Sequence, residues 1–343
     1  MSFYNLKNYL YLLQKDCSIV ITGDSLAYNR YDFIDEPRMN AWDCPLAMRS
    51  WSFMLRDYLI GHSKNWCPAS NINYEFHNQN PSFVPQKASL IKKHDQRLPL
   101  TDQLPLDTLR FDIQDSDSAI QLKGCPEDLC FITNPKAALF ESDGLQYDLS
   151  GNTGLFSGKH FKWGKSKSGL LKNIKEGSLL NLAGAADAKT EVFMTGSGSK
   201  TVEWMLENSY ERIYKYKPDL CILIIGANNR RMNNPRSFKA ALYELLANLK
   251  KKKTEVILIS PPHSTTSDPQ WGQDNKYNPD ETVTKPIMDV LIRAAFDNNI
   301  PFINLFEFFS GIPNSKWRFD NTHFNKEGNL MLFKAIIENF FKE

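Results

Sequence analysis

The chain has 343 residues, of which 42% are hydrophobic and 23% are charged, close to ordinary soluble-protein usage. This composition excludes global disorder, and the length allows either two domains or one large α/β domain that carries an insertion. The 41 Lys and Arg residues nearly balance the 39 Asp and Glu residues, and the formal net charge is +2. Because no overall field would attract a polyanion, the sequence argues against a nucleic-acid partner.

Residues 1–15 mix Lys and Asn with apolar residues, which predicts an amphipathic helix. They lack both the continuous apolar core and the small-residue cleavage site of a secretory signal peptide. No apolar run in the chain reaches the roughly 18 residues that a membrane-spanning helix requires. We therefore expect a cytoplasmic protein without a membrane partner, and the sequence does not indicate an oligomeric state.

The six cysteines form no repeated Cys-x-x-Cys pair. The nearest two, Cys125 and Cys130, have no neighbouring histidine that would complete a zinc site. We expect free, reduced thiols, no metal and no cofactor.

Residues 18–22, Ser-Ile-Val-Ile-Thr, form a short β-branched run that ends at Gly23, which predicts a strand. The next periodic segment runs from Leu46 to Ile60 with apolar residues on one side, which predicts a helix. These segments therefore follow one another as a strand, a loop and a helix.

Residues 71–190 lack helical periodicity, and short strand-like segments alternate there with turn residues. These segments are residues 72–76, 109–113, 119–122, 129–132 and 145–149. We interpret the region as an inserted, β-sandwich-like domain, but residues 72–76 could instead form the second strand of the surrounding fold. The aromatic residues of the region could either stack on sugar rings or form its core; they are Tyr74, Phe76, Phe161 and Trp163.

Strands and helices alternate again after residue 190. Strands are predicted at residues 191–195, 220–225, 256–260 and 301–305, and helices at residues 201–208, 235–249, 286–297 and from about 326 to 340. Asn234 and Asn325 are the expected N-caps of two of these helices. Such alternation predicts a parallel sheet with helices on both faces, whose active groups lie at the carboxyl ends of the strands.

Two short motifs carry the residue types of nucleophilic catalysis, which needs a serine, an imidazole that accepts its proton and a carboxylate that orients the imidazole. Gly23-Asp-Ser25-Leu follows the first strand, where the glycine permits a tight turn and the serine hydroxyl can project from the sheet edge. Asp320 and His323 are three residues apart and precede the last helix. This spacing lets the carboxylate hold one imidazole nitrogen while the other faces Ser25.

The chain resembles the SGNH hydrolases, also called GDSL esterases and lipases, through four blocks in the order that the family requires. Residues 23–26 fit the first block, residues 197–201 resemble the glycine segment of the second, residues 226–229 resemble the third, and residues 320–323 fit the last. The resemblance implies a three-layer αβα, flavodoxin-like core with a parallel sheet. That core would comprise residues 1–70 and 191–343, and residues 71–190 would be the inserted β-rich domain.

The resemblance also implies a role for each matched residue. Ser25 would be the nucleophile, His323 the base and Asp320 the carboxylate that orients it. The oxyanion hole would consist of the backbone N–H groups of Ser25 and Gly198 and the side-chain amide of Asn228.

Two features depart from the family pattern. Asn229 stands where the third block usually has Asp, which raises the question of what supports that loop. The second departure is the 173 positions between Ser25 and Gly198, where the family generally needs a few tens. We attribute the excess to the β-rich insertion and expect it to leave and rejoin the core near the catalytic face.

Two other motifs allow a different interpretation. Residues 196–201, Gly-Ser-Gly-Ser-Lys-Thr, lie between a strand and a helix as a phosphate-binding loop does, but Ser199 and Met194 occupy the places where that loop needs glycine. Nucleotide binding is therefore not expected. Pro261-Pro-His263 follows the strand at residues 256–260, and His263 could either reach the rim of the site or serve a structural role.

Three functions are compatible with these residues. The first is a serine esterase that hydrolyses acyl esters, in the first place acetyl esters of a carbohydrate, through an acyl-Ser25 intermediate. A carbohydrate is expected because the predicted β-sandwich insertion is analogous to β-sandwich carbohydrate-binding modules. The second is a glycan O-acetyltransferase with the same triad, and the third is a non-catalytic glycan-binding protein on a hydrolase scaffold. The expected partner is a small-molecule or glycan ester.

Overall fold

The computed structural model describes residues 3–27, 50–78, 87–91, 106–113, 118–133, 139–149, 161–232, 234–263, 281–318 and 322–342. One six-stranded sheet has the order β1-β17-β16-β15-β2-β14. Its strands are β1 (Phe3–Tyr4), β2 (Cys17–Gly23), β14 (Thr190–Met194), β15 (Leu220–Ile224), β16 (Glu255–Ile259) and β17 (Phe302–Ile303). Every neighbouring pair is parallel except β1 and β17. The five parallel strands thus follow the flavodoxin-like order 2-1-3-4-5, as expected for a mixed α/β fold.

Strand β15 shows why this sheet needs helices on both faces. All five of its residues are buried, and they alternate between two hydrophobic clusters. Ile222 and Ile224 contact the cluster that contains α1 (Trp51–Gly61) and α9 (Lys326–Phe340). Cys221 and Leu223 contact the cluster on the opposite face. A strand buried on both sides reads as a continuous apolar run, which is what the sequence has here.

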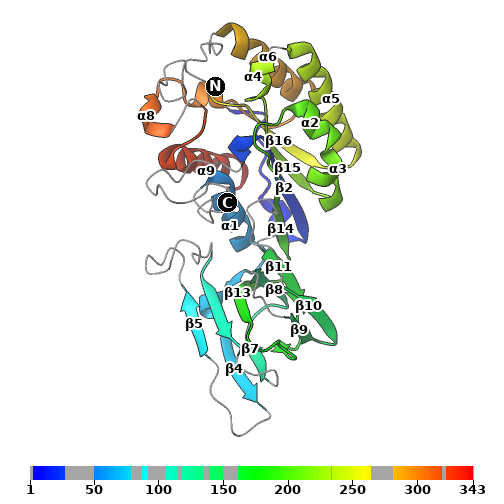
Figure 1. Cartoon of the computed structure of the whole chain (residues 1–343), viewed down its shortest axis with the longest axis vertical. Helices are drawn as coiled ribbons and strands as arrows, with labels where there is room; N and C mark the ends of the chain where they lie inside the picture. Colours follow the sequence, from blue (N-terminus) through cyan, green and yellow to red (C-terminus); the bar gives the residue numbers. More distant parts are fainter. Residues whose placement is uncertain are drawn as a thin grey trace.

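The second cluster belongs to the helices that follow the later strands. They are α2 (Val202–Glu207), α5 (Pro235–Lys251) and α6 (Glu281–Asp297). The short helices α3 (Ser209–Arg212) and α4 (Asn229–Met232) contact α2 and α6, respectively. The two remaining helices are short: α7 (Leu305–Phe308) and α8 (Asn314–Trp317). Figure 1 shows α2, α5 and α6 on one side of the sheet and α1 and α9 on the other. None of the helices in the described ranges combines the length and the apolar composition that a bilayer crossing requires.

The predicted elements of this region match the structure closely. Asn234 caps α5 by accepting a hydrogen bond from Ser237 N, and Asn325 caps α9 by accepting one from Gly328 N. Helix α6 begins five residues before the predicted start, and Pro286 lies inside it. The predicted helix at residues 46–60 is α1, whose first described residue follows its cap Ser50; residues 46–49 lie outside the described ranges.

The amphipathic helix predicted at residues 1–15 is wrong. Phe3 and Tyr4 instead pair with Ile303 and Phe302 as an antiparallel edge strand, and residues 10–14 form a 3₁₀ turn. The apolar residues that suggested a helix are used differently, because Leu12 and Leu13 enter the first cluster from this turn. Pairing with the short edge strand outweighs a weak local helix preference.

The segment between α1 and β14 is rich in strands, which belong to sheets separate from the main one; its role as an inserted domain stays a prediction. The larger sheet has the order β11-β8-β13-β6-β5, and β3 also pairs with β13. Its strands are β3 (Cys67–Pro68), β5 (Lys87–Ile91), β6 (Thr108–Asp112), β8 (Asp128–Ile132), β11 (Phe161–Lys165) and β13 (Leu179–Ala186). The smaller sheets are β12-β7-β4 and β10-β9. They consist of β4 (Asn73–Asn78), β7 (Ser118–Lys123) and β12 (Leu170–Leu171), and of β9 (Leu139–Ser142) and β10 (Leu145–Asp148).

These strands surround a third hydrophobic cluster. Tyr74 and Phe76 pack against it and contact Phe111 edge-to-face, with ring centroids 5.1 and 5.9 Å away. The two aromatic side chains therefore serve the core, as one of the two readings of the sequence had it. The alternative that residues 72–76 form the second strand of the main sheet is wrong, because β4 pairs with β7 and β14 takes that place.

The β-rich segment joins the main sheet at the amino ends of the parallel strands. Helix α1 runs antiparallel to β2, so that it starts near Leu26 and ends where Lys64 N donates to Leu13 O. Where the chain returns from the β-rich segment to the main sheet, Asp187 N donates to Lys64 O, and β14 then begins at Thr190. The expectation that the segment leaves and rejoins the core near the catalytic face is therefore wrong. An 11-residue helix, about 16 Å long, carries the chain away from that face first.

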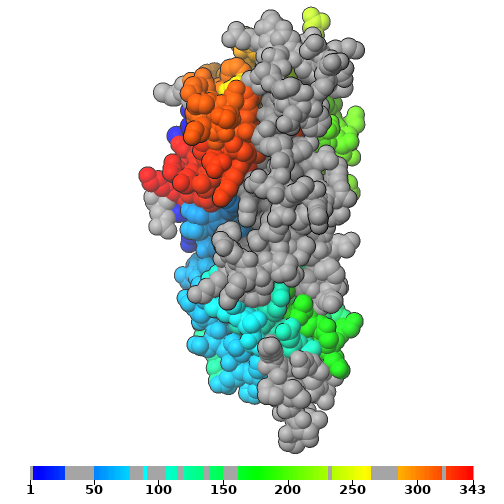
Figure 2. Space-filling view, turned by 60° about the vertical axis from the view of Figure 1, so that its left-hand side comes forward, coloured from blue at the N-terminus to red at the C-terminus, as the bar shows by residue number. Residues whose placement is uncertain are grey.

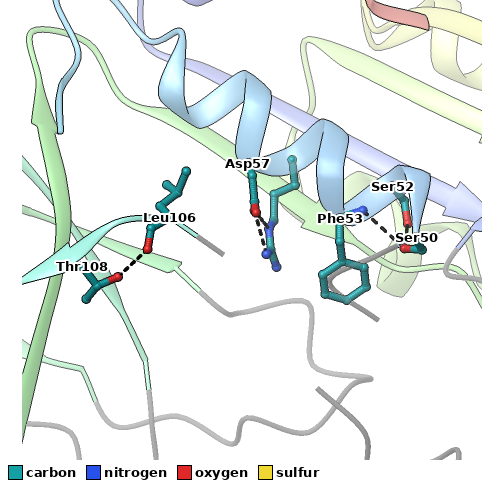
Figure 3. A network of polar contacts seen from close by, with 7 residues as sticks. Ser50, Ser52, Phe53, Asp57, Leu106 and Thr108 are labelled. Carbon is teal, nitrogen blue, oxygen red and sulfur yellow. Dashed lines mark hydrogen bonds and ion pairs between the residues drawn. The ribbon is translucent and has the colours of Figure 1, made fainter. Parts of the chain in front are cut away.

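The β-rich segment and α1 share buried contacts. The Arg56 guanidinium lies 4.7 Å from the ring centroid of Phe53 and 4.7 Å from that of Phe161 on β11. Its Nη2 donates to Asp57 Oδ1 at 2.8 Å, and both side chains are at most 3% exposed. Figure 3 shows Asp57 on α1 beside Leu106 and Thr108, and Figure 2 shows α1 between α9 and the first strands of the segment. Helix α1 thus packs against both parts of the molecule.

Candidate active site

The turn after β2 exposes a serine among buried neighbours. Gly23 has φ +136°, and a Cβ atom at this position would overlap the carbonyl oxygen of Ile224 on the adjacent strand, so only glycine fits. Asp24 N donates to that carbonyl at 3.2 Å, and the chain then enters a 3₁₀ turn over Ser25–Ala27. Asp24 and Leu26 are fully buried, whereas Ser25 is partly exposed. The local structure therefore points the Ser25 side chain out of the sheet edge.

The Ser25 hydroxyl meets the predicted imidazole. Ser25 Oγ lies 2.8 Å from His323 Nε2, although the two residues are 298 positions apart. His323 precedes α9, and the start of α9 is held by the Asn325 cap. A proton can pass between these two atoms without rearrangement, since the distance is that of a hydrogen bond.

Asp320, the predicted partner of His323, lies outside the described residues. Its role stays a prediction. Arg318 and Phe324, which come before and after it in the sequence, form an antiparallel bridge.

The second and third blocks lie next to the serine turn. Ser197 N donates to Gly23 O at 2.9 Å, which places the segment with Gly198 beside the turn. Asn228 follows Gly226, whose φ is +115°, and its Nδ2 donates to Lys200 O at 3.0 Å. This hydrogen bond orients the amide and leaves it one further N–H. The structure thus gathers Ser25, Gly198 and Asn228 at the carboxyl ends of three neighbouring strands.

Asn229 answers the question raised by its departure from the family pattern. Its Oδ1 accepts from Val202 N at 3.1 Å, and its Nδ2 donates to Glu203 Oε2 at 2.8 Å. Glu203 Oε1 in turn accepts from Ser237 Oγ, and these hydrogen bonds lower the Glu203 pKa although burial opposes them. An aspartate at 229 would face the Glu203 carboxylate with a like charge. The amide therefore supports the loop where Glu203 is present.

Asp24 is a site residue that the sequence analysis missed. Its Oδ1 accepts from Leu26 N at 3.0 Å and its Oδ2 accepts from Ala227 N at 3.3 Å. Burial raises its pKa to about 6, against the opposing effects of these hydrogen bonds and of His323 and Arg230. The sequence feature that could have identified Asp24 as a site residue is its position in Gly-Asp-Ser-Leu, between the end of the strand and the serine.

Trp51 and Asn329 were missed as well, because both read as ordinary helix residues. Trp51 Nε1 donates to Leu26 O at 2.8 Å, and Trp51 N donates to Asn329 Oδ1 at 3.0 Å. Both side chains are completely buried. The start of α1 therefore ties the serine turn to α9, which follows His323.

His263 has a structural position. Its Nε2 lies 3.2 Å from Asn314 Oδ1, and its ring packs edge-to-face against Phe306 and Trp317. Burial, together with the nearby Arg318, lowers its pKa. Its backbone carbonyl accepts from Arg318 Nη1 at 3.4 Å. The structural alternative for His263 is thus the better supported one.

The described thiols do not supply a competing nucleophile. Burial raises the pKa of Cys17 to about 11 and that of Cys221 to about 12, so both stay protonated at neutral pH. All five cysteines in the described ranges are free, and Cys44 lies outside them. Within the same ranges, no group of three or more His, Cys, Asp or Glu side chains is arranged to hold a metal ion.

Comparisons with known proteins show a similarity over the second half of the chain. Residues 179–330 match the model of the GDSL-like lipase/acylhydrolase family, a range that contains Gly198, Asn228 and His323 and begins after Ser25. No curated protein sequence matches the chain.

Solved structures of similar proteins cover less than half of the chain. A lipase/acylhydrolase from Enterococcus faecalis is 22% identical, with a TM-score of 0.38 over 44% of this chain and 75% of its own. The acetyl xylan esterase AlAXEase is 17% identical, with a TM-score of 0.37 over 43% and 80%. Axe2, an acetylxylan esterase from Geobacillus stearothermophilus, is 19% identical, with a TM-score of 0.38 over 45% and 74%. The family match shows that residues 179–330 of this chain are similar to the GDSL-like lipase/acylhydrolase family.

Proposed function

We propose that this hydrolase cleaves carboxylic esters through an acyl-Ser25 intermediate. The observation that carries the proposal is the 2.8 Å separation between Ser25 Oγ and His323 Nε2. Ser25 Oγ attacks the ester carbonyl carbon, its proton moves to His323 Nε2, and the carbonyl electrons move to oxygen. The protonated His323 then donates its proton to the leaving alkoxide. In the second half-reaction water attacks the acyl carbon, its proton moves to His323 Nε2 and from there to Ser25 Oγ, and the acid is released. Asp320 is the proposed partner of the other imidazole nitrogen.

Three donors are proposed to stabilise the oxyanion that forms in each half-reaction. They are the backbone N–H groups of Ser25 and Gly198 and the side-chain amide of Asn228. Two hydrogen bonds that hold this region support the proposal, namely Ser197 N to Gly23 O and Asn228 Nδ2 to Lys200 O. Donors that are fixed before the reaction need no reorganisation when the charge appears, which is what makes such a site effective.

The proposed substrate is an acyl ester, in the first place an acetyl ester, of a carbohydrate. The β-rich segment, proposed as a domain over residues 71–190, joins the sheet at the end opposite Ser25. It would therefore contact only a substrate long enough to extend along α1, about 16 Å. An acetylated oligosaccharide or polysaccharide meets that requirement, whereas an acetylated monosaccharide does not.

Phosphonate labelling tests the catalytic part of the proposal. A serine-directed phosphonate should modify wild-type protein at Ser25, and Ser25→Ala should abolish both labelling and hydrolysis of p-nitrophenyl acetate. Labelling of another residue, or activity that survives in Ser25→Ala, contradicts the proposed nucleophile. Ser315, an exposed serine in α8, provides a matched Ser→Ala control that should keep full activity.

Acetylated sugars of increasing length test the substrate. We expect kcat/KM to rise from the acetylated monosaccharide to oligomers that span α1. p-Nitrophenyl acetate, which has no sugar chain, should not show this gain. A constant kcat/KM across the series argues against contact with the β-rich segment. Adding unacetylated glycan acceptors separates hydrolysis from acetyl transfer, because a transferase moves acetyl groups to the sugar faster than to water.

A further inference from the structure

Asp24 connects the two segments that must stay in register for the proposed reaction. One carboxylate oxygen accepts from Leu26 N, in the turn that contains Ser25. The other accepts from Ala227 N, one residue before Asn228. Since the side chain is fully buried and both oxygens are used, its position determines the spacing between the serine and the oxyanion amide.

The charge of Asp24 is as important as its shape. Two cationic or titratable groups face it, His323 from the segment before α9 and Arg230 from α4, and both favour its ionised form. Arg230 is itself held in place, because its Nε donates to Ala227 O and its Nη1 donates to Pro262 O. A buried carboxylate near an imidazole stabilises the imidazolium more strongly than one in water would.

We propose that Asp24 is a positioning residue for acyl transfer, which holds Ser25 and Asn228 in register and stabilises His323 while it carries the Ser25 proton. The inference rests on the function proposed above. In the first step the Oγ–C bond forms, the carbonyl π bond breaks and the proton moves from Oγ to Nε2. Asp24 exchanges no proton in that step and remains ionised throughout. It is thus a second carboxylate of the site, in addition to the one proposed for Asp320.

Asp24→Asn is the sharpest test, because it keeps the volume and one acceptor oxygen but removes the charge. Its NH₂ group would also face one of the two backbone N–H donors that the carboxylate now satisfies. We expect kcat to fall at least about tenfold with KM within about threefold, since the interaction matters once charge develops. The acid limb of kcat/KM should move to lower pH, because the substitution removes the ionisation of Asp24, whose pKa burial raises to about 6.

Asp219→Asn is a matched control. Asp219 also accepts a backbone hydrogen bond at a strand end, from Ser18 N at 2.9 Å, but it lies at the amino end of the same sheet. Its substitution should leave kcat and the acid limb unchanged. If Asp24→Asn behaves like this control, with an unshifted acid limb and kcat within threefold of wild type, the inference is wrong.

A measurement on the wild-type protein covers the case in which Asp24→Asn does not fold. Asp24 must be ionised, in addition to the general base being unprotonated, for full activity, so the acid limb should become steeper than a single ionisation allows. A limb with the slope of one group down to about pH 4.5 overturns the inference. Wild-type protein that is neither labelled at Ser25 nor active on esters instead overturns the proposed function, and the two failures are thereby distinguished.

Discussion

Replacing Asp57 by Asn would leave the Arg56 guanidinium buried without its ion-pair partner. The pair lies on α1 at the boundary with the β-rich segment, and the two side chains are 2% and 3% exposed. Arg56 Nε and Nη2 both donate to Asp57 Oδ1, at 3.0 and 2.8 Å. The guanidinium also lies against the rings of Phe53 and Phe161, so it has no route to water without opening this boundary.

The expected loss in the free energy of unfolding comes from leaving a charge buried rather than from losing the attraction between the two charges. Removing one partner of a buried ion pair typically lowers the free energy of unfolding by about 3–5 kcal/mol, because the remaining charge is not compensated. Replacing both partners, as in Arg56→Met with Asp57→Leu, removes both charges and should recover most of that loss. The exposed pair Lys285 and Asp289, 2.9 Å apart with side chains 67% and 59% exposed, supplies the control. Asp289→Asn should change stability by less than about 0.5 kcal/mol.

Urea denaturation of wild type, Asp57→Asn, Asp289→Asn, the double variant and its two single variants Arg56→Met and Asp57→Leu measures these differences, with tryptophan fluorescence and far-UV circular dichroism as probes. We expect Asp57→Asn to lower the midpoint strongly, with the double substitution closer to wild type than either single one. Separation of the two probes in Asp57→Asn would indicate that the β-rich segment unfolds independently. A loss below about 1 kcal/mol in Asp57→Asn, or a double substitution that costs the sum of the single ones, would refute the reasoning.

Four further predictions concern the site. Gly23→Ala should abolish esterase activity and lower the melting temperature, because the new methyl group overlaps a backbone carbonyl; a variant with wild-type activity contradicts this. Asn228→Ala should lower kcat by about 10²–10³-fold with little change in melting temperature, and unchanged turnover would remove it from the oxyanion hole. Asn229→Asp should destabilise the protein and Glu203→Gln should rescue it in the double variant, as measured by thermal unfolding; absence of rescue contradicts the like-charge explanation. Burial raises the pKa of Asp24 to about 6 from 3.8, so its contribution to stability is fully present below about pH 4 and is lost as the pH rises through 6. The free energy of unfolding of wild type relative to Asp24→Asn should therefore fall by roughly 3 kcal/mol over that range, and a difference that rises with pH would contradict this sign.

The sequence predicts the parts of this protein in which local pattern and tertiary environment agree. Strand β15 is apolar throughout because it is buried on both faces, and its type and limits were predicted to within one residue. The capped starts of α5 and α9 were predicted from Asn234 and Asn325 for the same reason, since a cap is a local interaction. Ser25 and His323 were paired through two motifs whose structural contexts, a strand end and a helix start, are local as well.

What the sequence could not predict depends on contacts between distant segments. Phe3 and Tyr4 form a strand only because β17 offers an edge, so their own periodicity pointed to the wrong element. The attachment of the β-rich segment follows from the direction of α1 relative to β2, which no residue pattern states. Trp51 looked like a core residue of a helix, and nothing local indicated that its indole N–H reaches the turn that contains Ser25.

The central position of β2 has a consequence for synthesis on the ribosome. This strand lies between β14 and β15, yet Cys17 and its neighbour on β14, Thr190, are 173 residues apart. At a translation rate of about 5–20 residues per second, roughly 10–35 s pass between the synthesis of β2 and that of β14, the first of its two neighbours to be made. During that interval the whole β-rich segment emerges and can pair its own strands. The nascent chain therefore holds an apolar strand with two unpaired edges next to a folding neighbour, and those edges can pair with other extended segments until β14 and β15 are made.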